Sequence, residues 1–280
     1  MFNPAASVIA GTVLVASMWP FSGVSQTDTS EYPISPQGAL SIENASGDIS
    51  IRAWDGTTVK VVARRRAESK DDLANVRVDA SSAGGNVVIK SVYPSHCRDC
   101  DITYDIQLPR SAAVTAKDSS GDLAVTGIGG RLDLETASGN IDIRQAGGPI
   151  DARAASGNIN VTGTAQSLHA RTSSGNVKVD GASGSVDARA SSGNVSLRCP
   201  TVTALSEIKL EATSGDVRLE IPRNTGAAIA AETDAGSIRT NFGQAPRAGF
   251  AGATLAQTIG DGRVKINLIA VSGSITLQAI

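Results

Sequence analysis

His96, Cys97 and Cys100 form the cluster of this sequence whose side chains are most typical of metal or redox chemistry. A Cys-x-x-Cys pair can bind zinc or cycle between thiol and disulfide, but a structural zinc site needs four ligands and there is no second such pair. In an oxidising compartment the pair would instead form a local disulfide. We expect a Cys97–Cys100 disulfide that pins the loop before a strand at 102–108, with redox or metal chemistry, or free thiols, as alternatives. Cys199 is expected to stay unpaired within the chain.

A column of basic side chains is the candidate binding surface. Its members occupy equivalent positions of a repeat, with Glu135 at one further position: Lys117, Arg153, Arg171 and Arg189. Such a column suits an acidic glycan or another polyanion, because like charges about 5 Å apart repel unless something compensates them. Compensation is close at hand, since acidic residues stand two positions earlier on the same face, as in Asp151 and Asp187. The favoured interpretation is therefore a solvated, charge-balanced face.

A second polar column follows the glycines of the repeat, and its members are Asn140, Asn158, Asn176 and Asn194. It is either a polar binding stripe or, as we favour, a structural ladder of amides that hydrogen-bond one another. No G-x-S-x-G nucleophile elbow leads from a strand into a helix, and neither of the two histidines has a plausible Ser or Cys partner. We predict no catalytic residue, no metal site and no cofactor.

These columns arise from an 18-residue repeat. The motif Ser-Gly-Asn/Asp or a close variant recurs through the chain, and its glycines include Gly47, Gly121, Gly139, Gly157, Gly175, Gly193, Gly215 and Gly273. Five of these, from Gly121 to Gly193, are each 18 residues apart, and Gly85 lies two periods before Gly121. Glycine supplies a positive φ at a turn, and the Asn or Asp that follows tolerates the left-handed conformation. The glycines are therefore predicted to be structural turns.

Each repeat holds two short strands, because apolar and polar residues alternate on both sides of the turn. The first strand contributes an inward column formed by Leu132, Ile150, Leu168 and Val186. One coil cannot bury enough apolar surface to offset the entropy of ordering 18 residues, so coils must stack. The prediction is an all-β, single-stranded parallel β-solenoid of about 18 residues per coil. We expect it to be flattened and right-handed, with two faces favoured over three.

Composition bounds the class and location of the protein. The 280 residues include 29 glycines and only 3% aromatics, and the net charge of −2 gives no reason to expect nucleic acid as a partner. Residues 1–25 contain an uncharged apolar run, which predicts an exported protein with a cleaved signal peptide or an N-terminal membrane anchor. We assign 26–37 to a linker and 38–280 to the solenoid. Within it, 38–112 is less regular and includes a cap, 113–199 is strictly repetitive and 200–280 is looser.

Three stretches carry a resemblance to a known family: GALSIENASGDISI from residue 38, ITYDIQLPRSAAVTAKDSSGDLAV from residue 102, and GDGRVKINLIAVSGSITLQ from residue 260. The chain resembles the bacterial putative adhesins with a β-strand-repeat domain of unknown function, which are related to the head-GIN-type putative auto-transporter adhesins. This resemblance implies export, a β-solenoid and an adhesive or envelope role. It brings no catalytic residues to transfer.

Two functional classes remain open from the sequence. The first is a non-catalytic envelope protein, an adhesin or scaffold that presents a flat β-surface to an envelope protein or glycan in the periplasm or at the cell surface. The second is a β-helical polysaccharide lyase or hydrolase, and an envelope-stress or signalling module is a further alternative. Polysaccharide lyases and hydrolases gather carboxylates in a groove, whereas the carboxylates here are dispersed along a surface column. The binding or scaffold class is therefore favoured.

Overall fold

The computed structural model describes residues 11–13, 23–97, 99–164, 166–201 and 204–280. The chain divides into two compact units, residues 1–138 and residues 139–280. Both are built from β-strands, with one short helix among the described residues, so the predicted all-β class is confirmed. Most of the predicted signal peptide or anchor lies outside the described residues. Among those that are described, no helix is long and apolar enough to cross a membrane.

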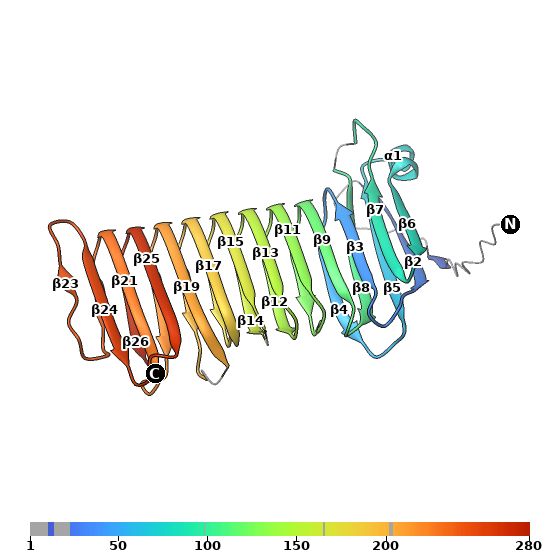
Figure 1. Cartoon of the computed structure of the whole chain (residues 1–280). Helices are drawn as coiled ribbons and strands as arrows, with labels where there is room; N and C mark the ends of the chain where they lie inside the picture. Colours follow the sequence, from blue (N-terminus) through green and yellow to red (C-terminus); the bar gives the residue numbers. More distant parts are fainter. Residues whose placement is uncertain (1–10, 14–22, 98, 165, 202–203) are drawn as a thin grey trace. The chain divides into compact units, whose positions relative to one another are not determined.

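Unit 2 is a stack of coils (Figure 1). Each coil contributes one strand to each of two sheets, and the strands of successive coils run parallel within each sheet. The long-strand sheet contains, in spatial order, β13 (Ile150–Ser156), β15 (Leu168–Ser174), β17 (Gly184–Ser192), β19 (Leu205–Ser214), β25 (Val264–Ser272), β21 (Ala227–Ala235), β24 (Ala253–Ile259) and β23 (Arg247–Ala248). The short-strand sheet contains β12 (Ile141–Ala146), β14 (Ile159–Thr164), β16 (Val177–Asp180), β18 (Val195–Arg198), β20 (Val217–Ile221), β26 (Ile275–Ala279) and β22 (Ile238–Thr240). The predicted parallel solenoid is confirmed, and it has two faces.

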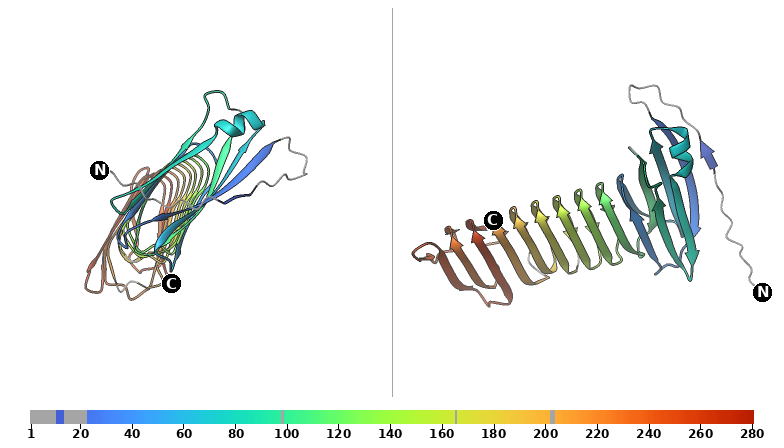
Figure 2. Two further views of the ribbon diagram at one scale, coloured as in Figure 1. Left: turned by 90° about the vertical axis from the view of Figure 1, so that its right-hand side faces the viewer. Right: turned by 90° about the horizontal axis from the view of Figure 1, so that it is seen from above.

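The 18-residue period of the sequence is the register of the sheets. Ile150 pairs with Leu168, and Leu168 pairs with Val186, so equivalent residues of successive coils stand side by side. These side chains are buried, as predicted, and they face a second buried column that includes Val177 and Val195. Between them lie buried alanines such as Ala170, whose small volume lets the two sheets approach. The result is a thin apolar core. The right-hand view of Figure 2 shows the stack from above.

The C-terminal coils do not stack in sequence order. Strands β25 and β26, the last of the chain, insert between the coil of β19 and β20 and the coil of β21 and β22 (Figure 1). The backbone confirms this order, because the Gly215 N–H donates to Ser272 O and the Gly273 N–H donates to Ala235 O, both at 3.0 Å. Beyond β21, the antiparallel strand β24 pairs with the exposed edge. A strand that runs against the stack covers an edge that would otherwise add further coils.

Unit 1 combines coils of the same kind with antiparallel strands. One sheet contains β11 (Leu132–Ser138), β9 (Ala113–Ser120), β3 (Ala39–Asn44), β7 (Asn86–Val92) and β6 (Arg77–Ala83). The other contains β10 (Leu123–Thr126), β4 (Ile49–Trp54), β8 (Asp101–Pro109), β5 (Thr58–Ala67), β2 (Val24–Pro33) and β1 (Gly11–Val13). The pairs β2–β5, β5–β8 and β6–β7 are antiparallel, whereas β3, β4 and their coil neighbours are parallel. The helix α1 (Lys70–Asn75) begins after Ser69, whose side chain caps it.

Two expectations for this N-terminal region differ from the structure. Residues 24–33, most of which were assigned to a linker, form β2 along the whole length of β5. Gly85, which fits the 18-residue spacing, is not a coil turn: Gly84 and Gly85 form the two-residue loop of the β6–β7 hairpin. Their φ angles of 59° and 79° are typical of the type I′ turn, which requires positive φ at both positions. A glycine in a hairpin cannot be told from a glycine in a coil turn by sequence, because both positions require a residue that adopts a positive φ.

The turn glycines allow one coil to touch the next, as Gly157 shows. Its φ is +151°, and a Cβ built there would lie 1.8 Å from the carbonyl oxygen of Gly139 in the preceding coil. The Gly157 N–H donates to Ser174 O of the following coil at 2.8 Å. Conformation and close approach therefore both demand glycine, and the predicted structural role of this residue has two independent physical reasons.

Replacement of Gly157 by valine should reduce the free energy of unfolding by more than about 3 kcal/mol, since backbone strain adds to a collision with Gly139. Ser156→Ala, at the adjacent exposed position, is the control and should cost less than about 1 kcal/mol. Urea denaturation of the full chain checks both values. Equal midpoints for the wild type and Gly157→Val would show that the turn tolerates a side chain.

Candidate binding surface

The arginine column of unit 2 lies on the outer face of the long-strand sheet, where Arg153, Arg171 and Arg189 stand in register on β13, β15 and β17. Each is held by a carboxylate. Arg153 pairs with Asp151. Asp187 binds Arg189 at 2.8 Å and lies 3.6 Å from Arg171. Arg153 and Arg189 thus pair with the aspartate two positions earlier on their own strand, whereas Arg171 lies near Asp187 of the neighbouring strand.

Asp187 shows the electrostatic effect of this arrangement. Burial alone would raise the pKa of its carboxyl, but the hydrogen bond and charge of Arg189, with the charges of Arg171 and His169, hold the pKa below its usual value. The carboxylate thus stays ionised and the face stays charge-balanced. Lys117, the member of the column in unit 1, likewise pairs with Glu135 at 3.4 Å on the neighbouring strand. The acidic residues neutralise the column in each unit, so it presents alternating signs and not a positive stripe.

The asparagine column forms a hydrogen-bonded ladder within unit 2. The side-chain Oδ1 of Asn140 accepts the backbone N–H of Asn158 at 3.0 Å, and Asn158 and Asn176 each accept the backbone N–H of the next asparagine at 2.9 Å. The ladder continues from Asn194 to the N–H of Asp216 and from Asp216 to the N–H of Ser274, each at 2.8 Å. These side chains join coils and are already occupied by hydrogen bonds.

The asparagines do not adopt the left-handed conformation that this residue type tolerates. Among the described residues, Asp99 and Gln145 are the non-glycine residues with positive φ. The asparagines have no need of the left-handed region, because the glycine before them takes the unusual conformation.

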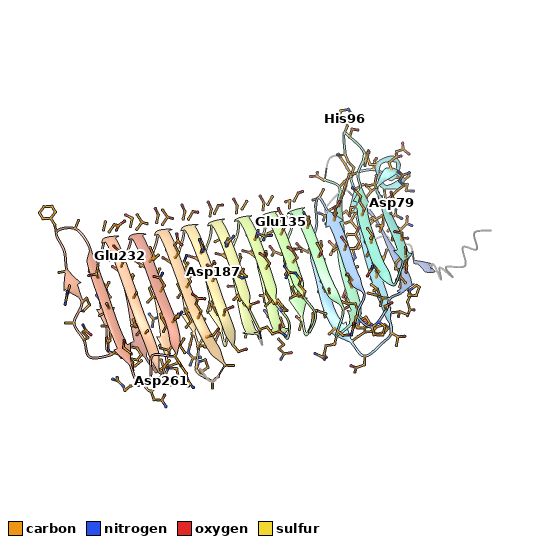
Figure 3. The ribbon with its side chains drawn as sticks, in the orientation of Figure 1. Asp79, His96, Glu135, Asp187, Glu232 and Asp261 are labelled. Atoms are coloured by element: carbon orange, nitrogen blue, oxygen red, sulfur yellow. A yellow bond between two sulfur atoms is a disulfide. The ribbon has the colours of Figure 1, made fainter. Side chains whose placement is uncertain are left out.

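Cys97 and Cys100 are joined by a disulfide, with their Cα atoms 5.7 Å apart. It closes the loop between β7 and β8, and His96 projects from the same loop (Figure 3). In the described part of the chain, no three His, Cys, Asp or Glu side chains are grouped so that they could hold a metal ion. Cys199 is a free thiol in the core, 3.9 Å from Ala182 O, and burial raises its pKa.

Residues 40–278 match the family model named Toastrack DUF4097, which spans almost the whole solenoid. The chain belongs to this family. The resemblance to β-strand-repeat adhesins with a domain of unknown function is thereby confirmed. No curated protein sequence matches the chain.

Solved structures to which the chain is similar come from bacteria. A putative adhesin from Bacteroides fragilis has 14% identity and a TM-score of 0.52, with 91% of this chain and 97% of that chain covered. A putative adhesin from Parabacteroides distasonis has 10% identity, 98% coverage of both chains and a TM-score of 0.41. A putative lipid binding protein from the same species has 16% identity, a TM-score of 0.35, and 91% and 96% coverage. At these identities, the Bacteroides fragilis protein supports the shared fold.

The first unit of this Toastrack chain also contains a buried polar network that sequence patterns did not indicate. Asn44, at the end of β3, donates through Nδ2 to the carbonyl oxygens of Ser46, Gly47 and Ile102 at 2.9 to 3.2 Å. Its Oδ1 accepts from Ser91 Oγ at 2.6 Å and from the Tyr93 hydroxyl at 2.8 Å. Burial raises the pKa of Tyr93 to about 12, so the phenol remains a neutral donor. Asn44 therefore satisfies backbone carbonyls inside the turn.

Asp118 pairs in register with Asn44 on the next coil of this Toastrack chain. It is 5% exposed, and neither carboxylate oxygen has a hydrogen-bond partner of normal geometry. At the same position of other coils, Thr136 and Thr172 donate to the carbonyl oxygen of a turn glycine. An ionised carboxylate at this position cannot donate as the threonines do. Burial raises the pKa of Asp118 to about 6, and the nearby charges of Asp48 and Asp122 add a smaller increase. The backbone N–H groups of Ser120 and Ser119 act in the opposite direction and lower this pKa.

The raised pKa predicts how stability depends on pH. The folded state binds this proton more tightly than the unfolded state, whose carboxyl has a pKa of 3.8, so stability falls as pH rises from about 4 through about 6. Asp118→Asn, which can donate as Asn44 does, should match the wild type near pH 4 and exceed it by about 1 to 2 kcal/mol at pH 7.5. Urea unfolding across this range measures the difference, with the exposed Asp79→Asn as control. A difference that does not change with pH would contradict the assignment.

Proposed function

We propose that this chain is a non-catalytic cell-envelope protein, an adhesin or scaffold that presents the outer face of its solenoid to a macromolecular partner. The partner would be an envelope protein or a glycan, and not a nucleic acid. The observation that carries the proposal is the outer face of the long-strand sheet in unit 2, where ion pairs repeat in register from coil to coil. The names of the similar putative adhesins support an adhesive role.

Rigidity makes this face suitable for binding. Arg153 and Arg189 are each held by a carboxylate on the same strand, and the strands are hydrogen-bonded at a spacing of about 4.8 Å. Side chains that are already ordered lose little entropy when a partner binds. Alternating charges at a fixed spacing favour a partner with the complementary pattern, which provides specificity more than raw affinity.

The titration of the carboxylates supports binding over catalysis. Asp118, whose pKa burial raises to about 6, is 5% exposed and lies inside a coil. Glycan-cleaving enzymes need a raised carboxyl pKa in an accessible cleft, close to a second carboxylate. The carboxylates of the outer face are instead paired with arginines, and Asp187 has a lowered pKa.

Charge reversal on this face tests the proposal. Arg153→Glu with Arg171→Glu should reduce binding of the immobilised full chain to envelope vesicles from its own source bacterium by at least about tenfold. The matched control is Arg144→Glu with Arg218→Glu on the short-strand sheet, where each arginine also pairs with an acidic residue two positions away. Thermal unfolding should change by no more than about 1 kcal/mol for either pair, because exposed ion pairs contribute little. Equal binding by both variants and the wild type would overturn the proposed face.

Export completes the proposal, since the apolar N-terminal segment and the Cys97–Cys100 disulfide are both suited to an oxidising compartment. In protein recovered from the envelope fraction, a maleimide mass tag should label none of the three cysteines in the folded chain. It should label Cys199 alone after unfolding, and all three after unfolding with reduction. Recovery from the cytoplasm with three reactive thiols would contradict export and the disulfide together.

A further inference from the structure

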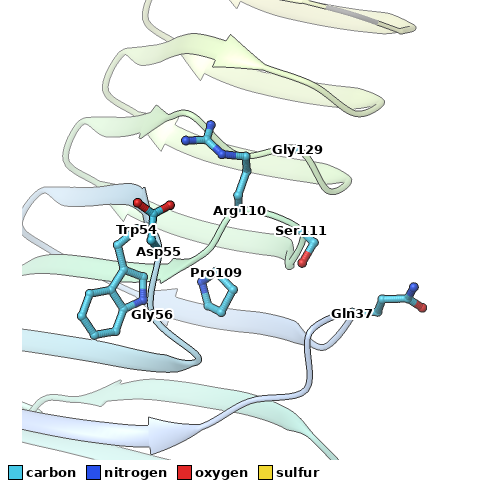
Figure 4. Close-up of a pocket in the computed structure, with 8 residues that line it drawn as sticks. All are labelled: Gln37, Trp54, Asp55, Gly56, Pro109, Arg110, Ser111 and Gly129. Atoms are coloured by element: carbon cyan, nitrogen blue, oxygen red, sulfur yellow. The ribbon is translucent and has the colours of Figure 1, made fainter.

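A concavity of about 800 Å³ in unit 1 is not part of the outer face described above. It is lined by Gln37, Trp54, Asp55, Gly56, Pro109, Arg110, Ser111 and Gly129 (Figure 4). Trp54 and Pro109 end the parallel strands β4 and β8 and are neighbours in register. The remaining residues come from loops, so the concavity lies where the regular strands stop. Its volume is within the range of small-ligand sites.

Trp54 supplies a rigid aromatic surface there. Its indole Nε1 donates to Thr58 O at 3.0 Å, which fixes the polar edge of the ring. A Cβ on Gly56 would lie 2.3 Å from the ring atoms Cε2 and Cζ2, so the ring packs directly on the Gly56 backbone. The ring is thus held in place while Trp54 still lines the concavity. Such an aromatic group gives contact area at a low entropic cost.

The polar groups beside the indole are available for a ligand. Arg110 uses Nη1 to donate to Gly127 O at 2.8 Å, which orients the guanidinium and leaves its other N–H groups for further bonds. Asp55 and Gln37 are exposed, and neither side chain has a hydrogen-bond or ionic partner among the described residues. Arg110 and Asp55 do not form an ion pair with each other. The lining therefore offers a donor group, an acceptor group and an amide that does both.

We propose that this concavity binds a neutral pyranose unit of a glycan. The indole would contact the apolar C–H face of the sugar ring, Asp55 would accept from neighbouring hydroxyls, and Arg110 would donate to hydroxyl or ring oxygens. Hydroxyls both donate and accept, which matches this mixed set. The charges of Asp55 and Arg110 cancel, so a neutral sugar suits the site better than an acidic one.

The site binds and does not cleave, because Asp55 is its only carboxylate and glycoside hydrolysis uses two. It is also independent of the proposed adhesive face, since none of its lining residues belongs to that face. Variants of one surface therefore leave the other to be tested separately.

Tryptophan fluorescence of the full chain tests the proposal. The sequence has two tryptophans, and Trp19→Phe leaves Trp54 as the single reporter. Cellobiose, maltose and N,N′-diacetylchitobiose are titrated as neutral probes, and digalacturonic acid as an acidic one. At least one neutral disaccharide should change the emission saturably, in the millimolar range or tighter. No saturable change with any neutral probe up to about 20 mM, or tighter binding of the acidic probe, would overturn the assignment.

Substitutions then localise the binding. Asp55→Ala should weaken it about tenfold, because hydrogen bonds to a charged group are lost. The Asp55 side chain is exposed and makes no hydrogen bond or ion pair within the described residues, so the fold should tolerate the change. The exposed Asp79→Ala on β6 is the charge-matched control and should leave binding unchanged. Trp54→Ala, followed by saturation-transfer NMR of the sugar protons, should abolish the transfer. Unchanged binding in Asp55→Ala and Trp54→Ala would show that the sugar binds elsewhere.

Discussion

The close approach of one turn to the next governs how the coils stack. A Cβ on Gly175 would lie 2.1 Å from Gly157 O, and one on Gly193 would lie 2.0 Å from Gly175 O. Only glycine permits this backbone contact, and the contact sets the axial position of every coil relative to its neighbour. Strands on both sides of the turn are then aligned in register, so residues 18 positions apart become neighbours. The inward columns, the asparagine ladder and the outer ion pairs all follow from that alignment.

Alternation along each strand separates two tasks. Inward residues such as Leu168 and Ala170 form a thin core, while outward residues two positions apart, such as Asp187 and Arg189, lie close enough to pair. The asparagine ladder satisfies the backbone N–H after each turn glycine and so links coils at the edge. The buried core consists of inward residues, so the outward residues are free to differ from coil to coil.

Departures from the repeat concentrate at loops and at the ends of the stacks. In unit 2, β24 runs antiparallel to β21 and covers a sheet edge. In unit 1, the strands β5 and β6 also run against their neighbours, and the concavity around Trp54 lies where β4 and β8 end. Regular coils provide a rigid support, whereas the irregular segments bring different side chains together. The buried side chains of Asn44 and Asp118 lie in unit 1, where coils meet irregular strands.

The features of a single coil can be read from the amino-acid pattern: its 18-residue length, its two strands, its inward columns and its turn glycines. These features are local and periodic, so the same residue pattern recurs in each repeat and can be recognised without the structure. The carboxylates that would compensate the arginines were also evident, because they stand two residues away on the same strand. Tertiary structure alone decided which coil neighbours which. Strand β25 lies between β19 and β21 although it follows both in sequence, Gly84 and Gly85 close a hairpin, and Asp118 stacks beside Asn44 across more than seventy residues. Such contacts depend on how the ends of the stacks are covered, which is a property of the assembled sheets and not of any one repeat.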